Sequence, residues 1–538
     1  MTTGSDEIER LAAQRRLVDA LRNSAAFGHG VRDCVVIETH ISYVLLAGDY
    51  AFKIKKAVDF EFLDFTTLKA RRYYCAEEVR LNRPLAPAIY LDVVAITGSI
   101  EAPSLNGDGP ALEFAVRMRR FDQDALLSRL IAHNSLGREH VDALARTVAG
   151  FHRTTARAPA SAPFGSPSAV LQPALQNFAQ ILEVATDRSD RRELERLREW
   201  TVREHVRCTP LIEHRRHGFI RECHGDLHLN NIALIDAQVT LFDRVEFNES
   251  LRWTDVMSDV AFLVMDLRER GRPDLAARFL NAYLEMTGDF EGLEVLPFYT
   301  AYRAMVRAKI ASLRMNQGPS GGERDALANE YRRYIGLVRA HGHGRPAIVV
   351  MHGLAGSGKS TVSEALVELT GGIRVRTDVE RKRLHGLQSS ERSDSPVAQG
   401  LYSKAETDRV YRHVCGVVRG IAKAGFVAIA DGTFLKRWQR DLFRDAAESI
   451  GVPFVIVACA APLPLLRERV ERRAAKGDDA SEATLAVLET QLMDQEGIIE
   501  TEEAAVVRHS TTVSSTPNAT ATIVKDMLEA AYAESDPT

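Results

Sequence analysis

The sequence predicts two domains: an α+β domain comes first, and an α/β domain with a parallel sheet follows. Three observations predict this order. Strand-like alternation and helical patterns share the first third of the chain, and helical patterns then dominate up to about residue 340. A short connector with the sequence HGHGRP follows. Beyond it, fully apolar runs alternate with helical patterns, which is typical of a parallel sheet covered on both faces.

We place the domain boundary in this connector. The first domain then spans 1–342, with a core at about 25–330, and the second spans 343–538, with a core at about 345–500. A chain of 538 residues is long enough to bury both cores.

The first domain opens with a helical pattern that sets Ile8, Leu17 and Leu21 on one apolar stripe. Residues 31–55 alternate like strands, with a hairpin turn at 47–49. The further elements expected in this domain are a helix at 68–81, strands at 91–96 and 111–118, helices within 122–210, short strands and turns at 224–247, and helices over 251–340. The buried strands expected in the second domain are 347–351, 373–375, 427–430 and 454–458.

Composition narrows the class of protein. Lys and Arg number 69 against 73 Asp and Glu, and the net charge of -4 argues against a dedicated nucleic-acid binder. This net charge does not exclude small anionic ligands, because a local basic cleft does not require a protein with a net positive charge. No apolar run approaches the ~18 residues of a membrane span. The polar first residues do not resemble a signal peptide, so we expect a cytoplasmic protein.

The second domain carries a phosphate-binding motif. Residues 353–360 read GLAGSGKS and fit the pattern GxxxxGK[ST] between a predicted strand and a predicted helix. Glycines let backbone N–H groups wrap phosphates at the start of a helix. Lys359 would neutralise the β- and γ-phosphates of ATP, and Ser360 would hold Mg²⁺. The nucleotide-binding residues expected here are Gly353, Gly356, Ser357, Gly358, Lys359, Ser360 and Thr361.

Two carboxylates follow predicted strands of this domain, at the edge where a parallel sheet binds ligands. Asp378 follows the strand at 373–375 and would accept a proton from an acceptor hydroxyl, or would simply cap the helix at 379–384. Asp431 ends the strand at 427–430 and would be the carboxylate of the Mg²⁺ site, or a plain turn residue.

Arginines on the helix after the strand at 454–458 would close over the transferring phosphoryl group, or would form a solvated charged face. The residues expected to do so are Arg467, Arg472 and Arg473, with Arg469 on the same helix. This half resembles the small P-loop kinases of the gluconate-kinase, zeta-toxin and polynucleotide-kinase kind, over about 345–500. The resemblance implies phosphoryl transfer from ATP to a hydroxyl of a small molecule or a nucleic-acid end.

The first domain carries a second constellation. Residues 224–231 read HGDLHLNN, in which Asp226 can act on a hydroxyl proton while Asn231 ligates Mg²⁺. Asp243 follows the run VTLF, where a second metal carboxylate belongs. Lys53 ends a strand pattern, as a phosphate-pairing lysine does, and Glu78 on the next helix would be its partner. Lys55 shares the face of Lys53 and is the rival lysine, and Glu77 is the rival glutamate.

These motifs resemble the aminoglycoside phosphotransferase and choline-kinase branch of the protein-kinase-like fold, over about 25–330. The resemblance implies that Asp226 is the base, that Asn231 and Asp243 ligate Mg²⁺, and that Lys53 contacts the α- and β-phosphates. It makes His224 a structural histidine and leaves His228 unassigned. Protein kinases cover the phosphates with a glycine-rich loop, whereas the first hairpin here, at 38–43, has no glycine. The aminoglycoside phosphotransferase branch also lacks a full glycine loop.

The whole arrangement resembles bacterial proteins described as bifunctional aminoglycoside phosphotransferase/ATP-binding proteins. We therefore expect an ATP- and Mg²⁺-dependent phosphotransferase that acts on hydroxyl groups of small molecules at two nucleotide sites. The alternative is that one domain, the first in particular, is a non-catalytic nucleotide sensor or scaffold that regulates a P-loop kinase or ATPase. A P-loop switch and a nucleic-acid end kinase are further alternatives, and no pattern specifies an oligomeric state.

Overall fold

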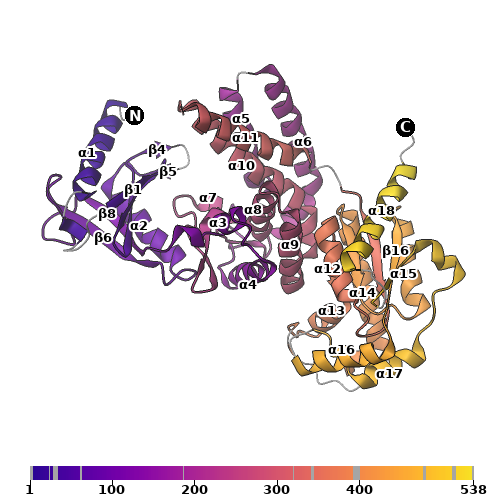
Figure 1. Cartoon of the computed structure of the whole chain (residues 1–538). Helices are drawn as coiled ribbons and strands as arrows, with labels where there is room; N and C mark the ends of the chain where they lie inside the picture. Colours follow the sequence, from indigo (N-terminus) through magenta and orange to yellow (C-terminus); the bar gives the residue numbers. More distant parts are fainter. Residues whose placement is uncertain are drawn as a thin grey trace. The chain divides into compact units, whose positions relative to one another are not determined.

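The structure is a computed structural model. It describes residues 4–22, 25–27, 34–60, 63–185, 187–318, 320–340, 344–389, 391, 400–476, 480–511 and 516–535. The chain forms two compact units (Figure 1). The first unit holds Met1–Ala143, Gly150–Val170 and Ile212–Leu263, and the second holds Leu144–Ala149, Leu171–Leu211 and Val264–Thr538. The domain boundary predicted between 342 and 343 lies outside the described residues and stays a prediction.

The first unit contains an antiparallel sheet of six strands in the order β1-β2-β3-β8-β6-β7. Alternating side chains such as Leu45, Phe52 and Ile96 are buried on one face of the sheet. The other face carries α2, whose Cys75 and Val79 pack with Val116. The elements are α1 (Gly4–Arg22), β1 (Cys34–Glu38), β2 (Ser42–Ala47), β3 (Tyr50–Lys55), α2 (Leu68–Asn82), β6 (Tyr90–Gly98), β7 (Pro103–Leu105) and β8 (Glu113–Arg119).

The predicted hairpin turn at 47–49 is confirmed, because β2 ends at Ala47 and β3 begins at Tyr50. The predicted first helix is also present as α1, and Leu17 and Leu21 are buried in it. The prediction for Ile8 is wrong, since its side chain is 70% exposed. The apolar stripe of α1 is therefore shorter than its sequence indicates.

Short elements follow in the first unit. The strand β9 (Ile220–Glu222) pairs with β12 (Trp253–Asp255), and β10 (Ile232–Ile235) forms a hairpin with β11 (Gln238–Leu241). The single turn η3 (Leu229–Asn231) lies between β9 and β10, and the loop that contains Asp243 follows β11. The turn η3 and the β10–β11 hairpin match the strands and turns expected over 224–247. The strands β9 and β12 lie outside that stretch, and β12 interrupts the region 251–340, which was expected to be helical.

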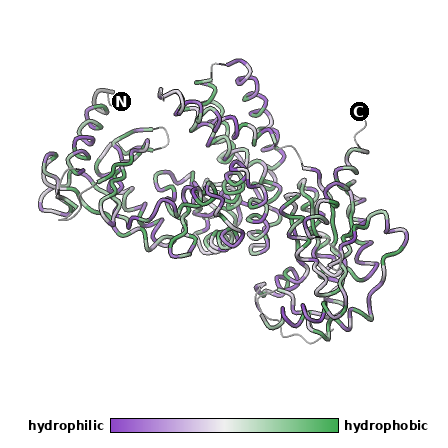
Figure 2. The backbone as a smooth tube through the Cα atoms, in the orientation of Figure 1, coloured by the Kyte–Doolittle hydropathy of each residue, from purple (hydrophilic) through white to green (hydrophobic). Residues whose placement is uncertain are grey.

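The long helices are divided between the two units. They are α4 (Arg138–Thr154), α5 (Pro167–Val184), α6 (Arg188–Arg215), α8 (Val256–Glu269), α9 (Pro273–Thr287), α10 (Leu296–Asn316) and α11 (Gly321–Arg339). Most of α4 and α8 belongs to the first unit, and the others lie wholly or mostly in the second. Figure 2 shows α6 mostly in the purple of hydrophilic residues, while Leu194 and Leu197 are buried on its inner face. None of the described helices is long and apolar enough to cross a membrane.

The second unit also contains a five-stranded parallel sheet in the order β14-β15-β13-β16-β17. Helices α9, α12 and α18 pack on one face, and α14 and α15 pack on the other, so the expected α/β arrangement is confirmed. The edge strand β17 was not predicted. The elements are β13 (Ala347–His352), α12 (Lys359–Thr370), β14 (Ile373–Arg376), α13 (Thr377–Leu384), α14 (Lys404–Lys423), β15 (Val427–Asp431), α15 (Arg437–Ser449), β16 (Phe454–Ala460), α16 (Leu463–Lys476), α17 (Leu485–Asp494), β17 (Val506–Ser510) and α18 (Pro517–Ser535).

Candidate functional sites

The first candidate site begins with Lys53 on β3. Its Nζ lies 2.8 Å from Oε1 of Glu78 on α2 and 2.6 Å from Oδ1 of Asp243. The rival glutamate, Glu77, instead pairs with Arg80 one turn along the same helix. The structure therefore brings together the lysine, glutamate and aspartate that the sequence singled out.

The rival lysine, Lys55, points to the same glutamate from the next position on that face. Its Nζ lies 2.7 Å from Oε2 of Glu78 and also bonds Glu246. Lys55 is 1% exposed, whereas Lys53 pairs with Asp243, whose side chain is 41% exposed. Lys53 is thus the lysine beside the open carboxylate, and Lys55 belongs to the buried ion cluster behind it.

Glu78 and the two lysines hold each other ionised. Burial raises the pKa of Glu78, but the ammonium groups of Lys53 and Lys55 outweigh it and bring the pKa down to about 2. Burial lowers the pKa of Lys53, and the carboxylates of Asp243 and Glu78 outweigh it and leave this pKa well above its ordinary value. Lys53 is therefore a permanent cation next to Asp243.

The loop after β9 places Asp226 and Asn231 together. Nδ2 of Asn231 donates to the main-chain oxygen of Asp226 at 2.9 Å and to its Oδ2 at 3.1 Å. Asp226 is 39% exposed, so its carboxylate faces solvent while its position is fixed by the η3 turn. Asp243 has a φ of 63°, and its backbone N–H donates to the Tyr90 hydroxyl at 3.2 Å. This contact with Tyr90 was not predicted from the sequence.

His224 has the surroundings of a structural histidine. Its backbone N–H donates to Oδ2 of Asp259 at 2.7 Å, and that of Gly225 donates to Oδ1 at 3.0 Å. Its ring Nε2 lies 2.9 Å from the Phe242 carbonyl oxygen and donates to it. The ring thereby links the loop of Asp226 to the start of the Asp243 segment. His228, which the sequence left unassigned, has Nε2 at 3.3 Å from Oδ2 of Asp226.

The burial of His224 predicts a pH-dependent stability. Burial lowers its pKa to about 4, so below pH 6.5 the unfolded chain binds this proton before the folded chain does. Stability should therefore fall as the pH drops from 6.5 towards 4, by about 2 kcal/mol at pH 5. Urea unfolding at pH 7.5 and pH 5 measures this loss. It should disappear in His224→Gln, which keeps the donor to Phe242, and persist in the exposed control His217→Gln. An unchanged pH dependence in His224→Gln would contradict the assignment.

The first hairpin closes without glycine. In the turn between β1 and β2, the backbone N–H of Ser42 donates to the Thr39 hydroxyl at 3.0 Å, and the two hydroxyls lie 2.8 Å apart. Side-chain hydroxyls thus form hydrogen bonds within this turn. A glycine-rich loop would instead leave backbone N–H groups free to bind phosphates.

The second candidate site is the loop between β13 and α12. Gly353, Gly356 and Gly358 have φ values of 139°, 82° and 97°, which favour glycine. A Cβ at Gly353 would lie 2.3 Å from the Cys459 carbonyl oxygen, so this position excludes any side chain. The loop therefore has the backbone that its motif predicts.

Lys359 begins α12 and folds over this loop. Its Nζ donates to the carbonyl oxygens of Gly353 at 2.9 Å and Leu354 at 2.8 Å. Burial lowers the pKa of Lys359, and the charge of Arg473 lowers it further.

Asp431 ends β15 next to α12. The Ser363 hydroxyl lies 3.0 Å from Oδ2 of Asp431 and 3.0 Å from the Ser360 carbonyl oxygen, and it can donate its proton to either. Ser363 thus lies between Asp431 and the backbone of Ser360. It was not predicted from the sequence, although it follows Ser360 by one helical turn.

Asp378 lies in the first turn of α13. The N-cap of this helix is Arg376, so the alternative that Asp378 is the cap is wrong. Asp378 is half-buried, and its charge adds to the burial that raises the pKa of Tyr402.

The arginines of α16 divide into two groups. Arg467 pairs with Glu489 at 2.7 Å and Arg472 with Glu468 at 3.2 Å, and all four side chains are about half exposed. Arg469, by contrast, donates to the Gly356 carbonyl oxygen at 3.1 Å. The predicted roles of Arg467 and Arg472 stay predictions, and Arg469 is the arginine in direct contact with the loop.

Two family models match the chain. The model described as "Phosphotransferase enzyme family" matches residues 71–297, and the model described as "AAA domain" matches residues 348–498. The first match contains the loop of Asp226 and Asn231, and the second contains the phosphate-binding loop.

Similar proteins cover most of the chain. An uncharacterized protein of Mycobacterium tuberculosis is 32% identical over 461 residues, which is 85% of this chain and 90% of the relative. An uncharacterized protein of Mycobacterium bovis matches to the same extent. Among solved structures, an ethanolamine kinase of Plasmodium vivax is 11% identical and covers 59% of this chain and 86% of its own, with a TM-score of 0.38. A gluconokinase from Sinorhizobium meliloti is 21% identical and covers 36% and 99%, with a TM-score of 0.27.

Proposed function

Because the chain belongs to the family in which an aminoglycoside phosphotransferase-like domain precedes a P-loop kinase-like domain, we propose that it transfers phosphate from ATP to hydroxyl groups of small molecules at two Mg²⁺-dependent nucleotide sites. The observation that carries the proposal is the convergence of Lys53, Glu78 and Asp243 from β3, α2 and the segment after β11. Kinases of this fold use the same types of residue for phosphates and metal. Fold membership alone does not define the acceptor.

At the first site, Asp226 would accept the proton of the acceptor hydroxyl. Its exposed carboxylate, held in place by Asn231, suits this role. Asn231 and Asp243 would hold Mg²⁺, since both offer oxygen ligands beside Asp226 or Lys53. Lys53 would contact the α- and β-phosphates, with Glu78 fixing its position. When bound, Mg²⁺ neutralises charge on the phosphates.

At the second site, the N–H groups of the loop would surround the phosphates and Lys359 would neutralise them. The residues proposed to bind the nucleotide are Gly353, Gly356, Ser357, Gly358, Lys359, Ser360 and Thr361, with Arg467, Arg472 and Arg473 closing over it. Ser360 and Asp431 would hold Mg²⁺, since Asp431 ends β15 beside the first turn of α12, which contains Ser360, and Ser363 contacts both segments. Asp378 would be the base.

A second candidate function follows from the glycine-free first hairpin. A turn closed by Thr39 and Ser42 offers fewer free N–H groups to phosphates. The first domain would then be a nucleotide sensor or scaffold that regulates the P-loop domain, without transfer of its own.

The number of nucleotide sites tests the proposal. Calorimetry with a non-hydrolysable ATP analogue and Mg²⁺ should give two sites for the wild type. Lys359→Ala and Asp243→Asn should each lose one of them, and the exposed control Lys404→Ala should keep both. A single site that only Lys359→Ala removes would refute the first site and favour a scaffold. Two sites without transfer by the first would favour the sensor.

A further inference from the structure

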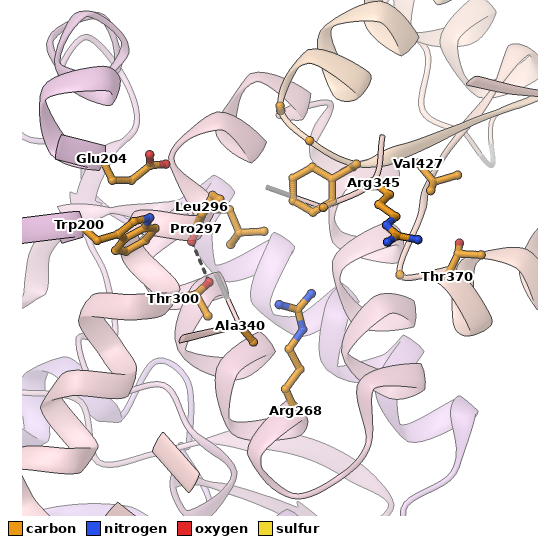
Figure 3. A pocket seen from close by; sticks show the side chains of 15 residues that line it. Trp200, Glu204, Arg268, Leu296, Pro297, Thr300, Ala340, Arg345, Thr370 and Val427 are labelled. Atoms are coloured by element: carbon orange, nitrogen blue, oxygen red, sulfur yellow. Dashed lines mark hydrogen bonds between the residues drawn. The ribbon is translucent and has the colours of Figure 1, made fainter. Parts of the chain in front are cut away.

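A cavity of about 240 Å³ lies within the second unit, away from the residues proposed for catalysis. Its walls come from α6, α8 and α10 on one side and from the ends of α12 and α14 and the start of β15 on the other. Figure 3 shows Trp200, Leu296 and Thr300 around it, together with the guanidinium groups of Arg268 and Arg345. At ~30 Å³ per water molecule this is room for about eight waters, so it suits a small ligand.

The cavity carries positive charge that its walls do not balance. Burial lowers the pKa of Arg268, and no carboxylate among the described residues forms an ion pair with it. The carboxylate in the lining, Glu204, is paired with Arg207 at 2.7 Å. Arg345 is exposed at the rim, where its guanidinium lies 5.8 Å from the centre of the Tyr532 ring. A half-buried guanidinium without a counter-ion is costly, and an anionic ligand would offset that cost.

The cavity lies at the opposite end of the parallel sheet from the phosphate-binding loop. Val427 lines the cavity and begins β15, whereas Asp431 ends the same strand beside α12. At ~3.3 Å per residue the strand separates them by about 13 Å. A ligand here would therefore be distinct from the nucleotide of the loop.

We propose that this cavity is a binding site for a small organic phosphate monoester with an apolar, ring-sized body. Two guanidinium groups match the two negative charges of a phosphate monoester, and the planar fork of arginine suits phosphate oxygens. Trp200 and Phe426 supply aromatic surface for the body of the ligand. The proposal does not rest on either nucleotide site being active.

Phenyl phosphate is a suitable probe. Calorimetry on the full chain, with both nucleotide sites saturated by the ATP analogue and Mg²⁺, should show one site for it. Binding should also change the fluorescence of Trp200, and this change should be absent in Trp200→Phe. Arg268→Gln and Arg345→Gln should each weaken binding about tenfold or more, as expected for a lost charge-assisted contact. Arg314→Gln, an exposed arginine of α10 outside the cavity, should leave the affinity unchanged.

Each of the following results would overturn the proposal or one part of it. No binding at millimolar phenyl phosphate, or equal affinity in the wild type and both cavity variants, would overturn the proposal. Benzoate binding as tightly as phenyl phosphate would overturn the phosphate class, and inorganic phosphate binding as tightly would overturn the role of the apolar body. Since Arg345 is exposed, Arg345→Gln keeps the test valid if Arg268→Gln does not fold.

Discussion

Asp226→Asn is expected to lower phosphoryl transfer at the first site by about 10²- to 10⁴-fold, the usual contribution of a positioned general base. The amide has nearly the same shape but cannot accept the hydroxyl proton. The loop should persist, because Asn231 still donates to the main-chain oxygen of residue 226 at 2.9 Å. Nucleotide affinity should therefore stay within about twofold of the wild type.

The measurement is transfer from labelled ATP to a panel of small hydroxyl compounds, made in the Lys359→Ala background so that the P-loop site is silent. Asp236→Asn is the matched control, since Asp236 is exposed in the β10–β11 turn and makes the same change of charge. Full transfer by Asp226→Asn would show that another group is the base. Loss of nucleotide binding together with transfer would instead indicate that Asp226 acts on the metal.

The sequence predicted those residues of the two candidate sites that follow a clear strand or loop pattern. Asp431 follows a fully apolar strand and Lys359 follows a glycine-rich loop, so their place at the ligand edge follows from the parallel sheet alone. Alternation also predicted Lys53 on a strand, but β3 continues two residues beyond it to Lys55, so Lys53 does not end the strand as the pattern indicated.

Some features could not be predicted from the sequence, because they depend on which of several similar side chains makes a contact, or on a strand with a weak apolar pattern. Lys53 and Lys55 are two residues apart on one strand, so alternation gives them the same face, and only their contacts separate them. On α16, several arginines share a helix, and charge alone did not indicate that Arg469 contacts the loop. The edge strand β17 reads Val-Val-Arg-His-Ser, which is too polar and short to stand out as a buried strand.

Substitutions of the two lysines of the first site should differ in their effects on stability, because the lysines have different second partners in the structure. Lys55→Met leaves Glu246, which is 4% exposed, without its cation. Removing one partner of a buried pair typically costs about 3–5 kcal/mol, so this variant should lose that much stability in urea. In Lys53→Met, Glu78 keeps Lys55, and the 41% exposed Asp243 can hydrate, so the loss of stability should be much smaller.

Nucleotide binding should show the opposite order. Lys53→Met should abolish the analogue site that Asp243→Asn also removes, while its fold persists. Hydrogen exchange of the β3 amides would show whether a loss of stability is confined to this sheet, and Lys69→Met provides an exposed control on α2. Equal destabilisation by Lys53→Met and Lys55→Met would contradict the division of roles between these lysines. A stable Lys55→Met variant that no longer binds nucleotide would also contradict it. The two lysines share one glutamate, so the division depends on their second partners: Asp243 is open to a ligand, and Glu246 is closed off from one.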